Sequence, residues 1–283
     1  MTTLLDRPAA AAPETGPTAT RRRRAVPRGR LLHAYTWLVI LWLMLPIFVI
    51  IALGFNDTTG KFNYEWQGFT LRWYQHLFDI SDLTTALVNS VTIALIVTAL
   101  STVLGTLIGF ALGRWRFRGR GPTELVLFAN ISAPEISLGT ALLSLFVLTN
   151  VPRGYWTIVI AQVMFDIAYV AVTVRARMAG FDVRLEEAAR DLGAGPVATF
   201  RLVTLPLLLP GVVAGALLAF ALSIDDFIIT QFNAGQTLTF PLWVYGATRA
   251  GIPPQVNAMG TLIFLVGVLL ALGNVLLLRR RRS

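Results

Sequence analysis

Long apolar runs separated by short polar segments occupy most of the chain. A bilayer-spanning helix needs about 20 predominantly apolar residues. Six runs meet this requirement, at residues 32–55, 86–112, 125–149, 156–174, 206–229 and 258–278. Pro134 interrupts the third run and Asp166 lies inside the fourth, so the limits of these two runs are the least sharply defined. The pattern predicts an all-α, polytopic membrane protein with six transmembrane helices.

Composition agrees with this class of protein. Of the 283 residues, 55% are hydrophobic and only 14% are charged, which excludes a soluble domain with a single core. Residues 1–30 are rich in Ala, Pro, Thr and Arg and lack apolar periodicity, so we expect a disordered cytoplasmic N-terminal tail before a transmembrane domain at residues 31–283. The chain has no cysteine, so disulfides and thiolate metal sites are excluded, and we predict no metal site.

The net charge of +9 is explained by where the basic residues lie. All but four of the 24 lysines and arginines fall before the first run, between the second and third, between the fourth and fifth, or after the sixth. The positive-inside rule therefore predicts that both termini and the segment 182–206 are cytoplasmic. Nucleic-acid or anionic-lipid binding by Arg21 to Arg24 is the alternative, but the placement favours a role in topology, and we predict no nucleic-acid partner.

Segment 182–206 contains a short amphipathic pattern between two apolar runs. Its apolar positions recur at helical spacing, i, i+3, i+4 and i+7, and are Leu185, Ala188, Ala189 and Leu192. Asp182 is a candidate N-cap and Gly193 a candidate C-cap, while Glu186 and Arg190 are spaced to form a solvent-facing pair. A helix of about ten residues rises about 15 Å, too short to cross a bilayer. It must lie at the membrane surface, either as an ordinary connector or as a docking element.

Four acidic residues interrupt the apolar runs: Glu135, Asp166, Asp225 and Asp226. Each costs about 2.5 to 3.5 kcal/mol at the bilayer centre, so all four are candidates for the substrate pathway. No lysine or arginine lies in the runs to neutralise them, which favours a cationic substrate. Structural roles are the alternatives: Asp226 capping backbone amides of a re-entrant segment, Glu135 bonding groups freed by Pro134, and Asp166 bonding a neighbouring helix.

Two other patterns predict structure. Gly105, Gly109 and Gly113 recur every fourth residue in the second run, which is typical of a smooth face for close helix packing. The polar segment after the first run carries seven aromatic residues between positions 56 and 83. An interfacial aromatic belt is favoured for them over a ligand site.

The short amphipathic segment resembles the EAA loop of binding-protein-dependent ABC importers. The resemblance is carried by Glu187-Ala188-Ala189, by Gly193 after three residues, and by Val203-Thr204-Leu205-Pro206 nine residues later, where isoleucine is more common than Val203. Residues 217–230, which include Ser223-Ile224-Asp225-Asp226-Phe227, and residues 134–139 are similar to spermidine/putrescine permeases. The chain thus resembles type I, MetI-like ABC importer permeases over residues 35–275.

The resemblance implies a six-helix permease subunit of a polyamine importer in the cell membrane. It implies a second permease subunit, expected to be a paralogue, two cytoplasmic ATPases and an extracytoplasmic solute-binding protein. The expected coupling residues are Leu185, Glu187, Ala188, Ala189, Leu192, Gly193, Leu205 and Pro206. The chain itself shows no P-loop, because Gly60-Lys61 is followed by Phe62 and lacks the earlier glycine. We therefore predict a non-catalytic subunit without a cofactor, with ATP and Mg²⁺ bound by the partner ATPases.

Three alternatives remain at this stage. The cargo of an ABC importer of this kind could be another small solute, such as an amino-acid derivative or an opine. A cation- or proton-coupled secondary transporter would also use intramembrane acids, and its uptake would persist without ATP. A membrane scaffold would hold a cytoplasmic partner without transporting any solute.

Overall fold

The computed structural model describes residues 28–60, 63 and 65–280. These residues form twelve α-helices and one π-helical segment, η1. The described residues divide into two units, with the division between residues 48 and 49. The helix α1 (Arg28–Gly54) begins in the first unit and is described alone; its stretch Leu31–Gly54 is long and apolar enough to cross a membrane. Most of the predicted tail lies outside the described residues.

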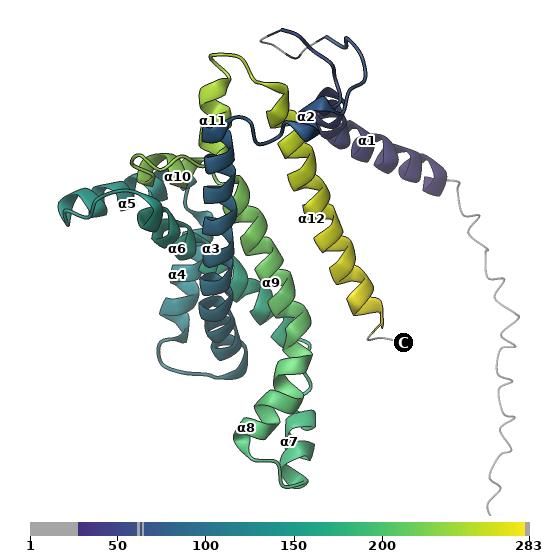
Figure 1. The fold of residues 1–283 in the computed structure, drawn as a ribbon. Coiled ribbons are helices and arrows are strands. Elements are labelled where there is room, and N and C mark those ends of the chain that lie inside the picture. Colours follow the sequence, from purple (N-terminus) through teal and green to yellow (C-terminus); the bar gives the residue numbers. More distant parts are fainter. Residues whose placement is uncertain (1–27, 61–62, 64, 281–283) are drawn as a thin grey trace, which may run out of the picture. The chain divides into compact units, whose positions relative to one another are not determined.

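Three long helices form the core of the larger unit. They are α3 (Ser81–Arg114), α6 (Tyr155–Met178) and α9 (Leu205–Asp225), and each packs against the other two (Figure 1). The helix α6 is the central one. Of the apolar 18-residue stretch that makes it long enough to span a membrane, 61% is buried, against 28% of the corresponding stretches in the spans that contain α3 and α9. The second, fourth and sixth predicted runs are confirmed as long helices, the sixth as α12 (Pro254–Arg280).

Small residues bring α3 and α6 together. A Cβ added at Gly105 would lie 2.6 Å from the Cβ of Val170, and one added at Gly109 would lie 2.5 Å from the backbone oxygen of Ala171. Neither glycine has room for a side chain, so the backbone of α3 lies directly against α6 at both positions. The predicted close packing is confirmed, and it fixes the central pair of the bundle.

The third predicted span is wrong as a single helix. Residues 125–149 are divided between α4 (Arg120–Ser132) and α5 (Glu135–Leu148), which meet at a bend of 108°. Pro134 has no amide hydrogen and disfavours a helical conformation at the residue before it, and Ala133 is accordingly extended. The described residues therefore contain five helices long enough to cross a membrane, or six spans if the bent pair counts as one.

The fifth predicted span, residues 206–229, also needs correction at its end. The helix α9 stops at Asp225, Asp226 is extended, and a separate short helix α10 (Ile228–Asn233) follows and packs on α5 and α6. At its other end, α9 is continuous with α8 (Pro196–Thr199) and η1 (Phe200–Thr204), which gives a span of 30 residues, Pro196–Asp225.

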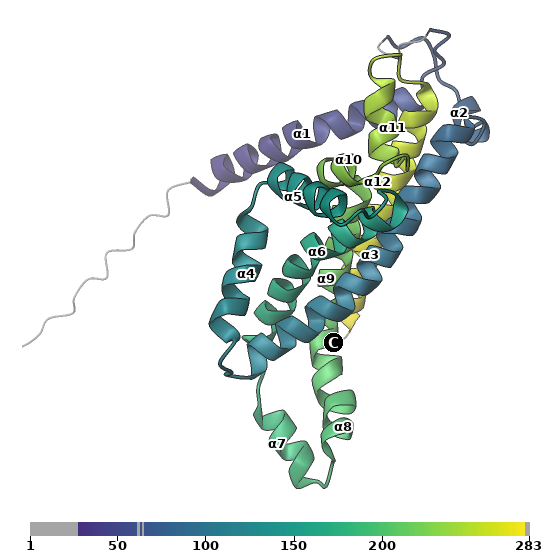
Figure 2. The same ribbon diagram turned by 90° about the vertical axis from the view of Figure 1, so that its left-hand side faces the viewer.

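The larger unit carries different elements at its two ends. Figures 1 and 2 both show α7 (Arg184–Asp191) and α8 at one end. At the other end lie α2 (Arg72–Gln75), α11 (Phe240–Ala247) and the loop that precedes α2. The break between α9 and α10 lies between these two ends.

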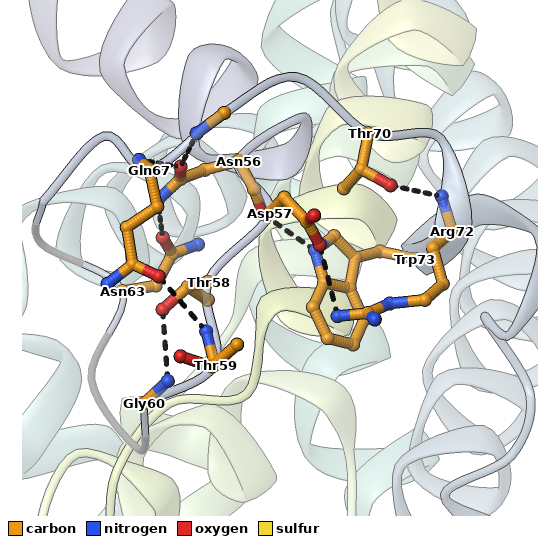
Figure 3. Close-up of polar contacts among 11 residues, drawn as sticks. Asn56, Asp57, Thr58, Thr59, Gly60, Asn63, Gln67, Thr70, Arg72 and Trp73 are labelled. Carbon is orange, nitrogen blue, oxygen red and sulfur yellow. Dashed lines mark hydrogen bonds and ion pairs between the residues drawn. The ribbon is translucent and has the colours of Figure 1, made fainter.

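The loop before α2 is organised around the buried side chain of Asn56 (Figure 3). Its amide nitrogen donates to Asn63 Oδ1 at 2.6 Å, and its oxygen accepts the backbone amide of Gln67 at 2.7 Å. The indole of Trp73 donates to the backbone oxygen of Asn56 at 2.7 Å, and Arg72 pairs with Asp57 at 3.1 Å. Trp73 of α2 thus contributes a hydrogen bond to the structure of this loop.

Candidate functional site

The predicted capping residues lie at the two ends of α7, although the N-cap position is Val183 and Asp182 comes one residue before it. The carboxylate of Asp182 accepts the backbone amide of Arg184 at 3.0 Å. Gly193 takes a left-handed conformation, with φ of +85°, and its amide donates to the backbone oxygen of Arg190. The amide of Ala194 donates to the backbone oxygen of Ala189, which completes a Schellman motif. The predicted surface helix is confirmed, with defined start and stop.

One side of α7 presents apolar side chains to the outside. Leu185 is 47% exposed and Leu192 is 89% exposed, and Glu187 and Ala188 are exposed beside them. Ala189 is half-buried. Of the remaining expected coupling residues, Leu205 is half-buried and Pro206 exposed, both in the first turn of α9. The face that sequence periodicity identified as apolar is therefore unpacked in the described structure.

The opposite side of α7 buries a carboxylate that the periodicity assigned to solvent. Glu186 is buried; its Oε2 lies 2.7 Å from Arg114 Nη2, and its Oε1 accepts the hydroxyl of Thr204 at 2.7 Å. The predicted pair with Arg190 is present, at the longer distance of 3.7 Å. The expectation that Glu186 faces water is wrong, because its main partner is 72 residues away in the chain.

The second candidate site lies where α9 breaks. Asp226 accepts the backbone amides of Ile229 at 3.3 Å and Thr230 at 2.8 Å, and so caps the start of α10. It also accepts the hydroxyl of Thr230 and, at 3.1 Å, the side-chain amide of Gln162 on α6. The geometry matches the structural alternative considered for Asp226, a residue bonding the amides of a short inserted helix.

Gln162 was not identified from the sequence. Its side-chain oxygen accepts the hydroxyl of Ser223 at 2.5 Å, and its nitrogen donates to Thr230 at 2.9 Å as well as to Asp226. It thereby joins α6 to the end of α9 and the start of α10. A glutamine inside an apolar span is itself a signal of an interhelical hydrogen bond, because an unpaired amide is costly in lipid.

Asp225 differs from its neighbour. Its side chain is exposed and lines a cleft of about 460 Å³, together with the aromatic side chains of Phe227, Phe240 and Tyr245. The rings of Phe227 and Tyr245 lie 4.8 Å apart. A carboxylate beside aromatic faces suits a small organic cation. A second cleft, of about 550 Å³ and lined mainly by residues of α11 and its flanking segments, contains no ionisable side chain.

The other two candidate acids lie close to this site. Asp166 on α6 is 1% exposed, and its Oδ2 has no hydrogen-bond partner among the described residues. Asp166 lies one helical turn after Gln162, which donates to Asp226, and Glu135 begins α5, which packs on α10. Glu135 is exposed at the first turn of α5, directly after the bend. The fold thus brings together four acids separated by up to 91 positions in the chain.

The fold and the two sites define a polytopic helical membrane permease. Residues 105–283 match the family described as the binding-protein-dependent transport system inner membrane component. The chain is 36% identical to the spermidine/putrescine transport system permease protein PotC of Haemophilus influenzae, over 88% of this chain and 97% of that protein. It is also 36% identical to the putrescine transport system permease protein PotI of Escherichia coli strain K12, over 78% of this chain and 81% of that protein. The chain therefore belongs to this family of transport-system membrane components.

Solved structures show the same fold. The crystal structure of a bacterial ABC transporter involved in the import of the acidic polysaccharide alginate matches with a TM-score of 0.62, over 91% of this chain and 97% of that chain. The sequence identity is 16%, so this likeness concerns the fold alone.

Proposed function

We propose that the chain is one permease subunit of an ATP-driven polyamine importer, in which cytoplasmic ATPases dock on α7. The observation that carries this proposal is the exposed apolar face of α7, with Leu192 89% exposed on a helix too short to cross a membrane. Apolar groups gathered on a surface helix favour a protein partner. Glu187, Ala188 and Ala189 lie on or beside this face, as expected for an ATPase-coupling helix.

The orientation follows from charge. The arginines at the α7 end include Arg114, which pairs with Glu186, and Arg120 and Arg175, which pair with Glu124. A concentration of arginine at one end of the spans supports a cytoplasmic location for that end, and with it cytoplasmic termini. The opposite end, with the loop built on Asn56, would face an extracytoplasmic binding protein that delivers the solute.

The cargo is inferred from the second site together with the relatives. Four acids gather near the break after α9, and Asp225 lines a cleft with aromatic side chains. Such a lining would attract a polyamine without enclosing it, which a conduit requires. The named relatives are permeases for spermidine and putrescine. The structural neighbour that imports an acidic polysaccharide indicates that the fold does not determine the charge of the cargo.

The remaining parts of the assembly complete the proposal. A second permease subunit, expected to be a paralogue, would form the other half of the pore. Two ATPases would bind ATP and Mg²⁺, because the sequence has no P-loop. Closure of the ATPase pair would push α7 and switch the pore between outward and inward openings as a rigid-body transition. This subunit would not be an enzyme.

Reconstitution tests the proposal. The complex of the chain, its permease partner and the ATPase is reconstituted in proteoliposomes together with the binding protein. ATP is supplied on the side of the membrane that carries the ATPase, and uptake of labelled putrescine and spermidine is measured. We expect uptake to depend on ATP and on the binding protein and to survive loss of the proton gradient. Uptake that continues without ATP but stops when the gradient collapses would identify a secondary transporter. ATP-dependent uptake of an amino-acid derivative or an opine, but of neither polyamine, would keep the class and change the cargo.

A further inference from the structure

Glu186 is the most enclosed charged side chain of the coupling helix. Its side chain is 4% exposed, whereas the side chain of Arg190, one turn further along, is 55% exposed. Both carboxylate oxygens are used: Oε2 pairs with Arg114 Nη2 at 2.7 Å, and Oε1 accepts the Thr204 hydroxyl at 2.7 Å. The buried charge is therefore matched by a cation and a hydroxyl donor, as buried charges require.

The two partners of Glu186 come from different transmembrane helices. Arg114 is the last residue of α3, and Thr204 is the last residue of η1, immediately before α9. A single carboxylate thus connects α7 with the ends of two of the three core helices. The π-helical turn at η1 is itself a local departure from regular helix of the kind found at functional positions.

Side chains do not completely fill the space beside this junction. A cavity of about 230 Å³ lies against Glu186, Arg114 and Thr204, with the aromatic side chains of Phe110, Trp115 and Phe200 in its lining. A buried ion pair is a weak source of stability, because desolvation offsets much of the attraction, but it does specify one geometry. Because a cavity adjoins the junction, the position of α7 relative to α3 and α9 depends on the polar contacts of Glu186 with Arg114 and Thr204.

We propose that Glu186 is a positioning residue that locks α7 to the ends of α3 and α9, so that a displacement of α7 moves both helices. The inference rests on the proposed function, because it assumes that an ATPase displaces α7. It gives the two sides of α7 separate tasks. The exposed face with Leu192 receives the partner, and the buried carboxylate of Glu186 passes the movement inward.

The test is Glu186→Gln in the reconstituted complex, with solute transported per ATP hydrolysed as the readout. The amide fits the same volume but removes the charge that holds Arg114. ATPase binding and membrane insertion should stay at the wild-type level, because the exposed face is unchanged. Transport per ATP should fall about fivefold or more, the lower end of typical coupling between distant sites. An unchanged ratio in an intact complex would overturn the proposal.

A matched control is Glu124→Gln. Glu124 also sits between two arginines, pairing with Arg120 at 2.8 Å and Arg175 at 3.0 Å, and both of these partners lie outside α7, on α4 and α6. Loss of this ion pair should leave transport per ATP unchanged. An equal fall in both variants would show a general effect of charge loss and would refute a specific role for Glu186.

If the complex that carries Glu186→Gln does not assemble, a second variant tests the proposal. The sequence contains no cysteine, so Arg114→Cys with Glu186→Cys introduces the only two thiols of the chain. In complexes whose other subunits lack reactive thiols, a short reductant-cleavable bis-thiol reagent should restore coupling, and cleavage should abolish it again in the same sample. A cross-linked protein that transports no more per ATP than the cleaved form would contradict the proposal.

The proposed function fails in a different way. If the wild-type chain binds no ATPase, or transports without ATP, the importer assignment itself is wrong. If the wild type is coupled and the Glu186 variants remain coupled, only the positioning role is lost.

Discussion

The two candidate sites treat charge in opposite ways. At α7, the buried carboxylate of Glu186 is matched by Arg114, while the apolar face lies open. At the break after α9, the acids lie in apolar runs that contain no lysine or arginine, and the hydrogen-bond donors to Asp226 are amides and a hydroxyl. The first arrangement fits a fixed mechanical junction. The second keeps negative charge available for a mobile cation.

The comparison also separates Asp225 from Asp226. These neighbours have the same side chain, but one is exposed in a cleft and the other caps a helix. Adjacent positions of a helix point about 100° apart, and the extended backbone at Asp226 increases their difference in environment. Sequence similarity to polyamine permeases covers both residues alike, whereas the contacts assign them different tasks.

The largest expected effect is on docking at α7. Leu192→Glu places a charge on the exposed face without disturbing any buried contact of the chain. We expect the dissociation constant for the ATPase to rise about thirtyfold or more, since burial of a leucine contributes about 2 kcal/mol. Binding of purified ATPase to permease in nanodiscs measures this. A dissociation constant equal to that of the wild type would show that this face of α7 is not part of the docking surface.

The second-largest effect is expected at Asp225 and tests whether its carboxylate contacts the substrate. Asp225→Asn removes the exposed charge while preserving the shape of the cleft, and we expect polyamine uptake at low concentration to fall about tenfold, or about 1.5 kcal/mol. ATPase binding should not change. Asp79→Asn, at an exposed ion pair with His76 on the loop side, is the control. An equal fall of polyamine uptake in the Asp79→Asn control would show a general effect of lost negative charge, and would contradict a contact of Asp225 with the substrate.

A smaller effect is expected at the end of α7. Gly193→Ala places a side chain at a φ of +85°, which costs about 1 kcal/mol, although no atom obstructs the added Cβ. Hydrogen exchange of the α7 amides should become faster, with little change in the core helices. Unchanged exchange would mean that the Schellman motif does not limit the stability of this helix.

The smallest effect is expected at Asp226. Asparagine can keep its single oxygen where Thr230 and Gln162 donate and loses only the longer bond from the Ile229 amide at 3.3 Å, so Asp226→Asn should lower the free energy of unfolding by about 0.5 kcal/mol. Thermal unfolding in detergent measures the stability, and uptake is measured in parallel. A tenfold loss of uptake with unchanged stability would return Asp226 to the substrate pathway beside Asp225.

Local patterns in the sequence predicted the features that local physics determines. Apolar runs predicted the long helices, the four-residue glycine spacing predicted a close helix contact, which α3 makes with α6, and Gly193 predicted the end of α7. The bend at Pro134 was visible as an interruption, but its angle of 108° depends on how α5 packs on α10. Helix periodicity alone cannot reveal such packing.

The errors share one cause, which is the dependence on partners far away in the chain. Glu186 was assigned to solvent because its neighbours in sequence are charged, yet Arg114 and Thr204 enclose it. The fifth predicted span was continued to residue 229 because Ile228 and Ile229 extend the apolar run, although a cap at Asp226 was the alternative. The cap supplied by Asp226 and the amide of Gln162 stabilise the separate helix. Both outcomes depend on tertiary contacts that override local propensity.

The backbone contact of α3 with α6 has a consequence for the transport cycle. Where the glycine backbone of α3 lies directly against α6, at Gly105 and Gly109, sliding by even a fraction of a turn would force atoms into one another. We therefore expect these two helices to travel as a fixed frame. We expect the rotations that open and close a passage to occur at Ala133-Pro134 and at Asp226, where regular helix gives way to extended backbone.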